Sequence, residues 1–190
     1  EFAKRTVAVI GDSTFWHSGV TGLIDLVYNR GISTVIILDN ETTAMTGHQE
    51  NPSTGRLLSG AAVPAIDFVA VAKAIGVRSV RVVDAYDLEA LEQVILEEVN
   101  REEPSVIVTR RVCVLKRGAP PKEAVLTVDP VRCKVCKKCI KLGCPALMLT
   151  EKTVSIDPLL CTGCKLCSDV CTFDAIHPVD SCDCSEPGHE

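Results

Sequence analysis

Short apolar runs alternate with amphipathic segments along the first 111 residues. Four runs rich in β-branched residues predict buried strands at 6–11, 33–39, 79–84 and 105–111. Between them, apolar residues at helical spacing predict helices at 18–31, 65–76 and 88–101, with Gly31 as the expected C-cap of the first. In the last helix, Glu89, Glu92, Glu97 and Glu98 are expected to form a solvated face. Alternating strands and helices predict an α/β fold in which helices cover a parallel sheet.

Polar residues follow the first two predicted strands at the point where each ends. Gly11, Asp12 and Ser13 come after the first strand, and Asp39 and Asn40 close the second. Ligands of parallel sheets bind at the carboxyl ends of the strands, and Mg²⁺ prefers oxygen ligands completed by water and phosphate. This pattern indicates a site for a phosphorylated cofactor. Turn chemistry alone also favours these residues, so either group taken singly is more simply explained as a turn or strand end, and it is the two groups together that favour a site.

The overall composition is that of a globular protein without a basic surface for nucleic acid. The chain has 46% hydrophobic and 24% charged residues and a net charge of −5. No apolar run approaches the roughly 18 residues of a membrane span, and the first residues lack a signal-peptide pattern. We therefore expect a cytoplasmic protein with neither a nucleic-acid nor a membrane partner.

Cysteine changes this picture, because ten of the eleven cysteines follow residue 132. Two runs, 133–145 and 161–172, each open with Cys-x2-Cys-x2-Cys and have a fourth cysteine a few residues later. They form an internal repeat in which the first three cysteines of each run are offset by 28 residues. Four residues precede the fourth cysteine of the first run, Cys144, and three precede that of the second, Cys171. This is the spacing of bacterial two-cluster ferredoxins, where the fourth cysteine of each run binds the other cluster.

If the fourth cysteine of each run binds the other cluster, the sequence predicts two [4Fe–4S] clusters. One is bound by Cys133, Cys136, Cys139 and Cys171, and the other by Cys161, Cys164, Cys167 and Cys144. The extra residue before Cys144 is expected to distort the first run, and Thr172 stands where a proline usually follows the fourth cysteine. Zinc is the competing interpretation of paired Cys-x2-Cys units, but two compact quartets of thiolates favour iron–sulfur clusters.

These features divide the chain into four parts. We expect an α/β cofactor-binding domain at 1–115, a linker at 116–125, a small α+β ferredoxin-like domain at 126–178 and an acidic tail at 179–190. Cys113 is expected to be a buried, inert thiol. Cys182 and Cys184 could bind a metal together with His189, although a disordered end is the simpler interpretation.

The first half also resembles a known family. Gly11-Asp12-Ser13 followed by Asn40 is similar to the thiamine-diphosphate motif, with Ser13 replacing its last glycine. The stretch DNETTAMTGHQENPSTG (39–55) resembles the 2-oxoacid:ferredoxin oxidoreductases, and within them the alpha subunits of the indolepyruvate type. The resemblance implies that Asp12, Asn40 and the Thr42 carbonyl hold Mg²⁺ against the diphosphate, that Gly11 and Ser13 pack close to the diphosphate, and that 43–49 borders the cofactor.

The resemblance further implies oxidative decarboxylation of an aryl pyruvate such as indolepyruvate. Coenzyme A would accept the acyl group, ferredoxin the electrons, and a smaller beta subunit would be the partner. The alternatives are an oxidoreductase for another 2-oxo acid, such as pyruvate, and a non-catalytic electron-transfer module. No catalytic side chain is assigned; His17 and His48 are the candidates for acid–base groups, and Phe15 and Trp16 are expected to pack rather than stack on substrate. Because nothing resembles the domain that clamps the aminopyrimidine, we expect these 190 residues to be a fragment of the alpha subunit that does not turn over alone.

Overall fold

The computed structural model describes residues 5–116, 124–150 and 153–179, and the chain divides into two compact units, 1–119 and 120–190. The predicted linker and acidic tail, with Cys182, Cys184 and His189, lie largely or wholly outside the described residues. Within those described ranges, no helix is both long and apolar enough to cross a bilayer.

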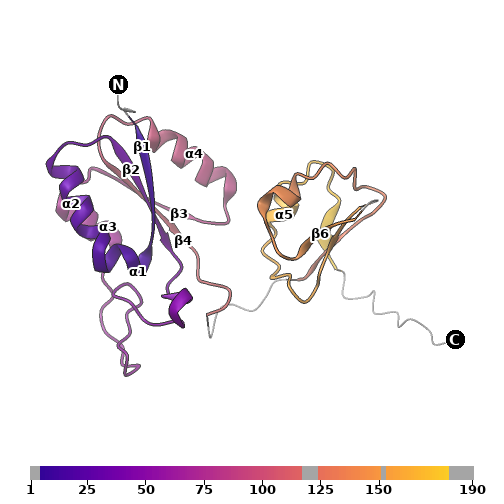
Figure 1. The fold of residues 1–190 in the computed structure, drawn as a ribbon, viewed down its shortest axis with the longest axis horizontal. Helices are drawn as coiled ribbons and strands as arrows, with labels where there is room; N and C mark the ends of the chain where they lie inside the picture. Colours follow the sequence, from indigo (N-terminus) through magenta and orange to yellow (C-terminus); the bar gives the residue numbers. More distant parts are fainter. Residues whose placement is uncertain (1–4, 117–123, 151–152, 180–190) are drawn as a thin grey trace. The chain divides into compact units, whose positions relative to one another are not determined.

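The first unit is an α/β fold (Figure 1). Its elements are β1 (Thr6–Gly11), α1 (Asp12–Thr14), the π-helical turn η1 (Phe15–Gly19), α2 (Val20–Tyr28), β2 (Ser33–Asp39), the 3-10 turn η2 (Ala44–Thr46), α3 (Phe68–Ile75), β3 (Ser79–Asp84), α4 (Leu88–Val99) and β4 (Ser105–Arg110).

All four strands are parallel, in the order β1-β2-β4-β3. α2 and α3 cover one face and α4 the other, as Figure 1 shows. Alternate residues of the central strands therefore enter two cores, since successive side chains of a strand point to opposite faces. Ile37 packs with Phe15 and Phe68 on one side, whereas Ile36 packs with Val94 on the other. The predicted strands and the α/β class are confirmed.

The first helical region differs from the prediction at both ends. Helical backbone begins at Asp12, directly after β1, passes through the π-helical turn and ends at Tyr28. Asn29, not Gly31, is the C-cap, and Arg30 takes the left-handed conformation with φ of 54°. The helical period of 18–31 was visible in the sequence, but the polar residues 12–14 carry no apolar signal and lay outside the predicted helix.

Glu98 is a second correction, because it belongs to the interior and not to the solvated face of α4. Its side chain is 1% exposed, whereas Glu89, Glu92 and Glu97 are exposed. Ser79 Oγ donates a hydrogen bond to Glu98 Oε1 at 2.9 Å, and Arg81 and Arg101 lie 3.8 and 3.6 Å from its carboxylate oxygens. A buried carboxylate is tolerated when it is paired and hydrogen-bonded in this way.

We expect Glu98→Ala to lower the free energy of unfolding by about 2 kcal/mol, because it removes a buried hydrogen bond and leaves a cavity. The matched control, Glu97→Ala, should change it by less than about 0.5 kcal/mol, since the Glu97 side chain is 44% exposed. Urea denaturation followed by fluorescence reports on this unit alone, because the chain has one tryptophan, Trp16. Equal effects of the two substitutions would contradict the assignment.

The second unit contains two two-stranded antiparallel sheets, consistent with the predicted α+β class. Its elements are β5 (Leu126–Val128), the 3-10 turn η3 (Cys139–Leu142), β6 (Leu147–Leu149), β7 (Val154–Ile156), α5 (Leu166–Asp169) and β8 (Ile176–Pro178). β5 pairs with β8, and β6 pairs with β7. Each sheet therefore takes one strand from each half of the sequence repeat. The core between them includes Leu126, Val154 and Ile176 together with cysteine side chains.

Candidate functional site

Polar side chains gather at the carboxyl-end edge of the sheet. Asp12 begins the helix after β1, Asp39 is the last residue of β2, and Asn40 follows it. Because β1 and β2 are paired in parallel, with Gly11 opposite Leu38, these groups meet. Asp12, Asp39 and Thr42 are each 3% exposed. The structure thus brings together the residues that the sequence placed at the ends of two strands.

The carboxylate of Asp12 is buried close to a second negative charge. Burial raises its pKa, and the neighbouring Asp39 raises it further, although hydrogen bonds from Ser13, Asn51 and Thr42 act in the opposite direction. Ser13 N–H donates to Oδ1 at 2.7 Å and Asn51 Nδ2 to Oδ2 at 3.2 Å. Among the described residues no cation pairs with Asp12.

Asp39, in contrast, is neutralised within the chain. Arg110, at the end of the adjacent strand β4, lies opposite it in the sheet register, and its Nε is 2.7 Å from Asp39 Oδ2. The Glu41 N–H lies 3.3 Å from Asp39 Oδ1, and Glu41 has φ of 58°. This left-handed residue turns the chain so that Thr42 N–H donates to Asn40 Oδ1 at 3.1 Å. Of the two buried carboxylates, Asp12 is the one left for an external cation.

The residues at this edge fit a metal–diphosphate group. A buried carboxylate without a positive partner is costly, and a divalent cation removes that cost. The Asn40 amide oxygen keeps a second lone pair beside its hydrogen bond to Thr42. A Cβ added at Gly11 would meet no atom within 4 Å, so the space beside this glycine is open. Ser13 is half-buried and presents its backbone N–H to Asp12.

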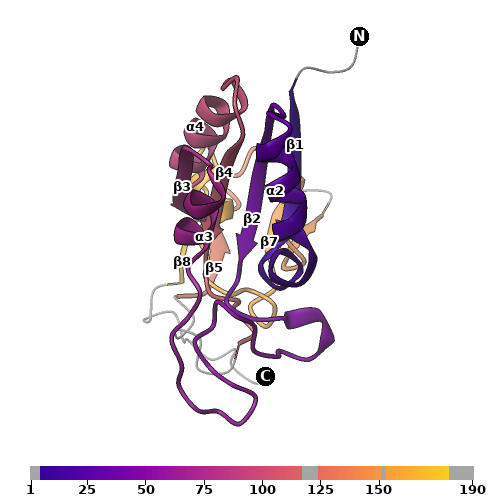
Figure 2. The same cartoon turned by 90° about the vertical axis from the view of Figure 1, so that its left-hand side faces the viewer.

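The long loop that follows β2 is organised around Asn51, which is 9% exposed. Its Oδ1 accepts hydrogen bonds from Ser53 N–H at 3.0 Å and Ser53 Oγ at 2.7 Å, while its Nδ2 reaches Asp12. Figure 2 shows the loop extending beyond the carboxyl-end edge of the sheet. A bridge between Thr43 and Gln49 closes its first part, and one between Arg56 and Ala62 its second. The Asn51 side chain therefore ties this loop to the carboxyl-end edge of the sheet, which we call the acidic edge after Asp12 and Asp39.

The other candidates from the sequence add no side-chain hydrogen bond to this network in the described part of the chain. His17 and His48 are both exposed, and no hydrogen bond of either ring is found in the described part of the chain. Phe15 is fully buried, and Trp16 stacks on Phe68 with ring centroids 4.5 Å apart. The aromatic residues therefore pack, as expected. Cys113 is half-buried rather than buried, and its N–H donates to the Asn40 carbonyl at 3.0 Å.

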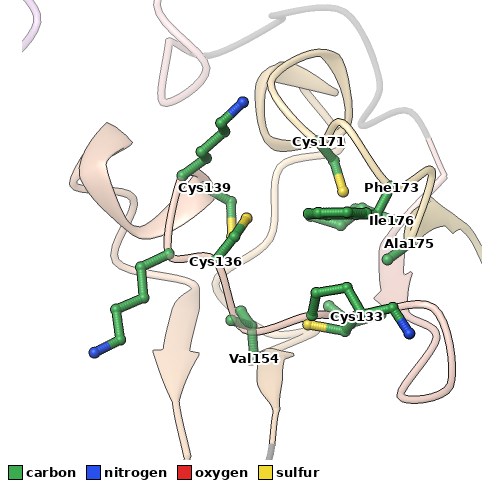
Figure 3. A pocket seen from close by; sticks show the side chains of 12 residues that line it. Cys133, Cys136, Cys139, Val154, Cys171, Phe173, Ala175 and Ile176 are labelled. Atoms are coloured by element: carbon green, nitrogen blue, oxygen red, sulfur yellow. The ribbon is translucent and has the colours of Figure 1, made fainter.

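The second unit places the first predicted quartet around one cavity. Cys133, Cys136, Cys139 and Cys171 all line it, together with apolar residues such as Val154 and Ile176. Figure 3 shows their sulfur atoms standing around one shared space. Across the described residues, no three His, Cys, Asp or Glu side chains form a group arranged to hold a metal ion. Thiols spread around a cavity suit a polynuclear cluster better than a zinc ion, whose ligands converge on one point.

The second predicted quartet also lies together. Burial, and after it the neighbouring Cys164, Cys161 and Cys144, raise the pKa of Cys167 from 9.0 to about 11. For Cys133 in the first quartet, burial is outweighed by hydrogen bonds from the backbone of Val154 and Val135, so its pKa is lowered. Burial also raises the pKa of Cys139 in the first quartet, so the direction of the shift differs between single cysteines and not between the quartets.

Backbone hydrogen bonds explain why the fourth cysteines cross between the halves. Asp129 N–H donates to the Ala175 carbonyl, and the equivalent Asp157 N–H donates to that of Ala146, each at 2.8 Å. These bonds carry the segment after each fourth cysteine to the opposite run. The two aspartates, Asp129 and Asp157, are 28 residues apart in the sequence, and the two alanines, Ala146 and Ala175, are 29 apart. The extra residue before Cys144 is taken up by η3 and Gly143, which has φ of 68°.

Two residues of the acidic edge were missed by the sequence analysis. Arg110 could have been found, because a basic residue at the end of one strand can neutralise an aspartate at the end of the neighbouring strand. Finding it required knowing that β4 lies beside β2. Asn51 was seen only as part of a long polar loop, because a bond to a residue 39 positions away leaves no local pattern.

Comparison with known proteins agrees with both units. The family model described as thiamine pyrophosphate enzyme, C-terminal TPP binding domain, matches residues 1–109. A 4Fe-4S binding domain model matches 154–177, which contains the second cysteine run.

Curated relatives are similar along almost all of this chain. An indolepyruvate oxidoreductase subunit IorA of Thermococcus kodakarensis is 42% identical over 185 residues, covering 91% of this chain and 28% of the relative. Its counterpart in Archaeoglobus fulgidus is 37% identical over 182 residues, covering 94% and 29%. The chain thus spans less than a third of the length of these relatives.

Among solved structures, a 2-oxoglutarate:ferredoxin oxidoreductase from Magnetococcus marinus has a similar fold. The TM-score is 0.50 at 15% identity, covering 56% of this chain and 40% of that one. With the family model matching more than half of the residues and the acidic edge in place, the chain belongs to the thiamine pyrophosphate enzyme family, through the C-terminal TPP-binding domain that its first unit forms.

Proposed function

We propose that this chain is the cofactor-binding and electron-transfer part of the alpha subunit of a 2-oxoacid:ferredoxin oxidoreductase that acts on aryl pyruvates. The observation that carries the proposal is the presence, in one chain, of an uncompensated buried carboxylate at a sheet edge and two cysteine quartets. The names of the curated relatives support indolepyruvate as substrate. Coenzyme A as acyl acceptor and a beta subunit as partner complete the proposal.

In this proposal the acidic edge binds Mg²⁺ and the diphosphate of thiamine diphosphate. Asp12, Asn40 and the Thr42 carbonyl supply oxygen ligands, and Gly11 and Ser13 border the diphosphate. Asn51 holds the Asp12 carboxylate in place, and Arg110 keeps Asp39 from adding a second uncompensated charge. Fixing the ligand oxygens before the cofactor arrives lowers the cost of ordering them on binding.

Each quartet holds one [4Fe–4S] cluster, and each cluster accepts one electron at a time. When bound, thiamine diphosphate supplies the decarboxylation of the 2-oxo acid. The net reaction consumes one 2-oxo acid, one coenzyme A and two oxidised one-electron carriers. It yields one acyl-CoA, one CO₂, one proton and two reduced carriers, so that atoms and electrons balance.

The substrate assignment is tested with the complete enzyme, assembled from its full-length subunits. We expect kcat/KM for indolepyruvate and phenylpyruvate to exceed that for pyruvate and 2-oxoglutarate by at least about 10-fold, as measured by reduction of ferredoxin. A preference for pyruvate or 2-oxoglutarate would indicate another 2-oxo acid oxidoreductase. Absence of turnover with every 2-oxo acid, with cofactor and clusters bound, would favour a non-catalytic electron-transfer module.

A further inference from the structure

The surface around the first cysteine quartet is strongly basic. The segment 132–144, which includes the four cysteines of the first run, contains one arginine and four lysines and no acidic residue. Lys134, Lys137 and Lys138 line the same cavity as the four cysteines, and Lys141 lies on the adjacent turn η3. All four lysines are exposed, and none forms an ion pair with a carboxylate in the described part of the chain.

The arginine of this segment behaves differently from the lysines. Arg132 Nε lies 3.5 Å from Asp129 Oδ2, and its Nη1 donates to the Asp174 carbonyl at 3.3 Å. Arg132 is therefore engaged in holding the two halves of the unit together. The four lysines, which form no ion pair among the described residues, have no such structural task, although the protein as a whole has a net charge of −5.

The second quartet lacks this basic surface and is less accessible. Its run, 161–172, has one lysine and one aspartate. Two of its four cysteines, Cys161 and Cys167, are buried, and none is exposed. In the first quartet only Cys139 is buried, and Cys136 is exposed. Of the two quartets, the first is the one that an approaching protein can reach.

The same difference between the two quartets favours electron transfer in one direction. The reduced cluster carries one more negative charge than the oxidised one, so nearby positive charge and solvent stabilise the reduced form and raise the reduction potential. Electrons therefore move favourably from a cluster in the buried quartet to a cluster in the exposed, lysine-rimmed quartet. Unpaired lysines also attract a negatively charged partner and increase its rate of association.

We propose that Lys134, Lys137, Lys138 and Lys141 form the docking surface for an acidic one-electron carrier protein, and that the cluster held by Cys133, Cys136, Cys139 and Cys171 is the exit point for electrons. The inference rests on the proposed function and adds to it the location of the exit. At each docking event one electron leaves the reduced cluster, which is oxidised, and one oxidised carrier is reduced. Two such events are needed for each 2-oxo acid consumed.

The test compares two electron acceptors in the complete enzyme. The variant Lys134→Glu/Lys138→Glu reverses two charges and leaves every cysteine in place; Lys73→Glu, an exposed lysine on α3, is the control. With an acidic bacterial-type ferredoxin at low ionic strength, we expect kcat/KM of the double variant to fall about 30-fold. The lower positive charge beside the cluster also affects its potential, but reduction of methyl viologen, a small dication that does not use the docking surface, should change far less than reduction of ferredoxin.

Salt and binding give independent readouts. For the unaltered enzyme, raising the ionic strength should weaken ferredoxin reduction, and the double variant should lose that dependence. Binding of oxidised ferredoxin, followed by surface plasmon resonance without turnover, should weaken in parallel. This measurement decides the docking surface even if the enzyme consumes no 2-oxo acid, a result that would count against the proposed function alone.

Two results would overturn the inference. One is unchanged ferredoxin binding and reduction in the double variant while methyl viologen reduction is retained. The other is loss of the partner subunit from the double variant on gel filtration, which would show that the lysines form a subunit interface. Equal losses in the Lys73→Glu control would show a general charge effect and would equally refute a local docking surface.

Discussion

Asp12→Ala is expected to weaken Mg²⁺-dependent binding of thiamine diphosphate by at least about 100-fold. Asp12 is the one buried carboxylate of the acidic edge without a cationic partner among the described residues, so its charge is available for the metal. Alanine removes that charge and the ligand oxygen together. Isothermal titration of the full-length subunit with the cofactor, at fixed Mg²⁺, measures the loss.

The control is Asp84→Ala. Asp84 also ends a strand of this sheet, β3, but it is exposed and pairs with Arg111 at 2.9 Å. Its removal should change cofactor affinity by less than about 3-fold. Asn51→Ala should lie between the two, about 10-fold weaker than the unaltered protein, because it frees the Asp12 carboxylate without removing it. Unchanged affinity in Asp12→Ala would refute the assignment of the metal site.

Paired cysteine substitutions are expected to lose iron according to the crossed arrangement. Cys136→Ala/Cys171→Ala removes two ligands from one predicted quartet and should leave about four iron atoms per chain. Cys136→Ala/Cys144→Ala removes one ligand from each quartet and should leave fewer, because both clusters are damaged. We expect this difference because two backbone hydrogen bonds, from Asp129 to Ala175 and from Asp157 to Ala146, bring each fourth cysteine to the opposite run.

Iron and acid-labile sulfide are measured in the anaerobically purified protein, with electron paramagnetic resonance to separate the two clusters. The unaltered chain should hold about eight of each. Cys113→Ala, outside both quartets, is the control and should match it. If Cys136→Ala/Cys144→Ala retained a whole cluster while Cys136→Ala/Cys171→Ala lost both, each run would bind its own fourth cysteine. Zinc in place of iron would refute the cluster assignment.

Much of the first unit followed from local pattern. The four strands have the predicted positions to within one residue, because runs of β-branched residues bounded by polar residues report burial directly. The helix after β1 was harder, since Asp12 and Ser13 favour a turn as readily as a first helical turn. Glu98 was misplaced because helical position alone does not show whether a neighbouring strand supplies a hydroxyl and an arginine, as β3 does with Ser79 and Arg81.

What the sequence determined by itself is the chemistry that depends on short spacing: Gly11-Asp12-Ser13 after a strand, Asn40 after the next, and two cysteine runs related by an offset of 28. What only the tertiary structure decided is which distant groups meet. Arg110 neutralises Asp39 because β4 lies beside β2, and Asn51 reaches Asp12 across 39 residues of chain. Spacing along the chain constrains only near neighbours, whereas contacts between distant residues depend on strand order and loop packing, which arise when the whole unit folds.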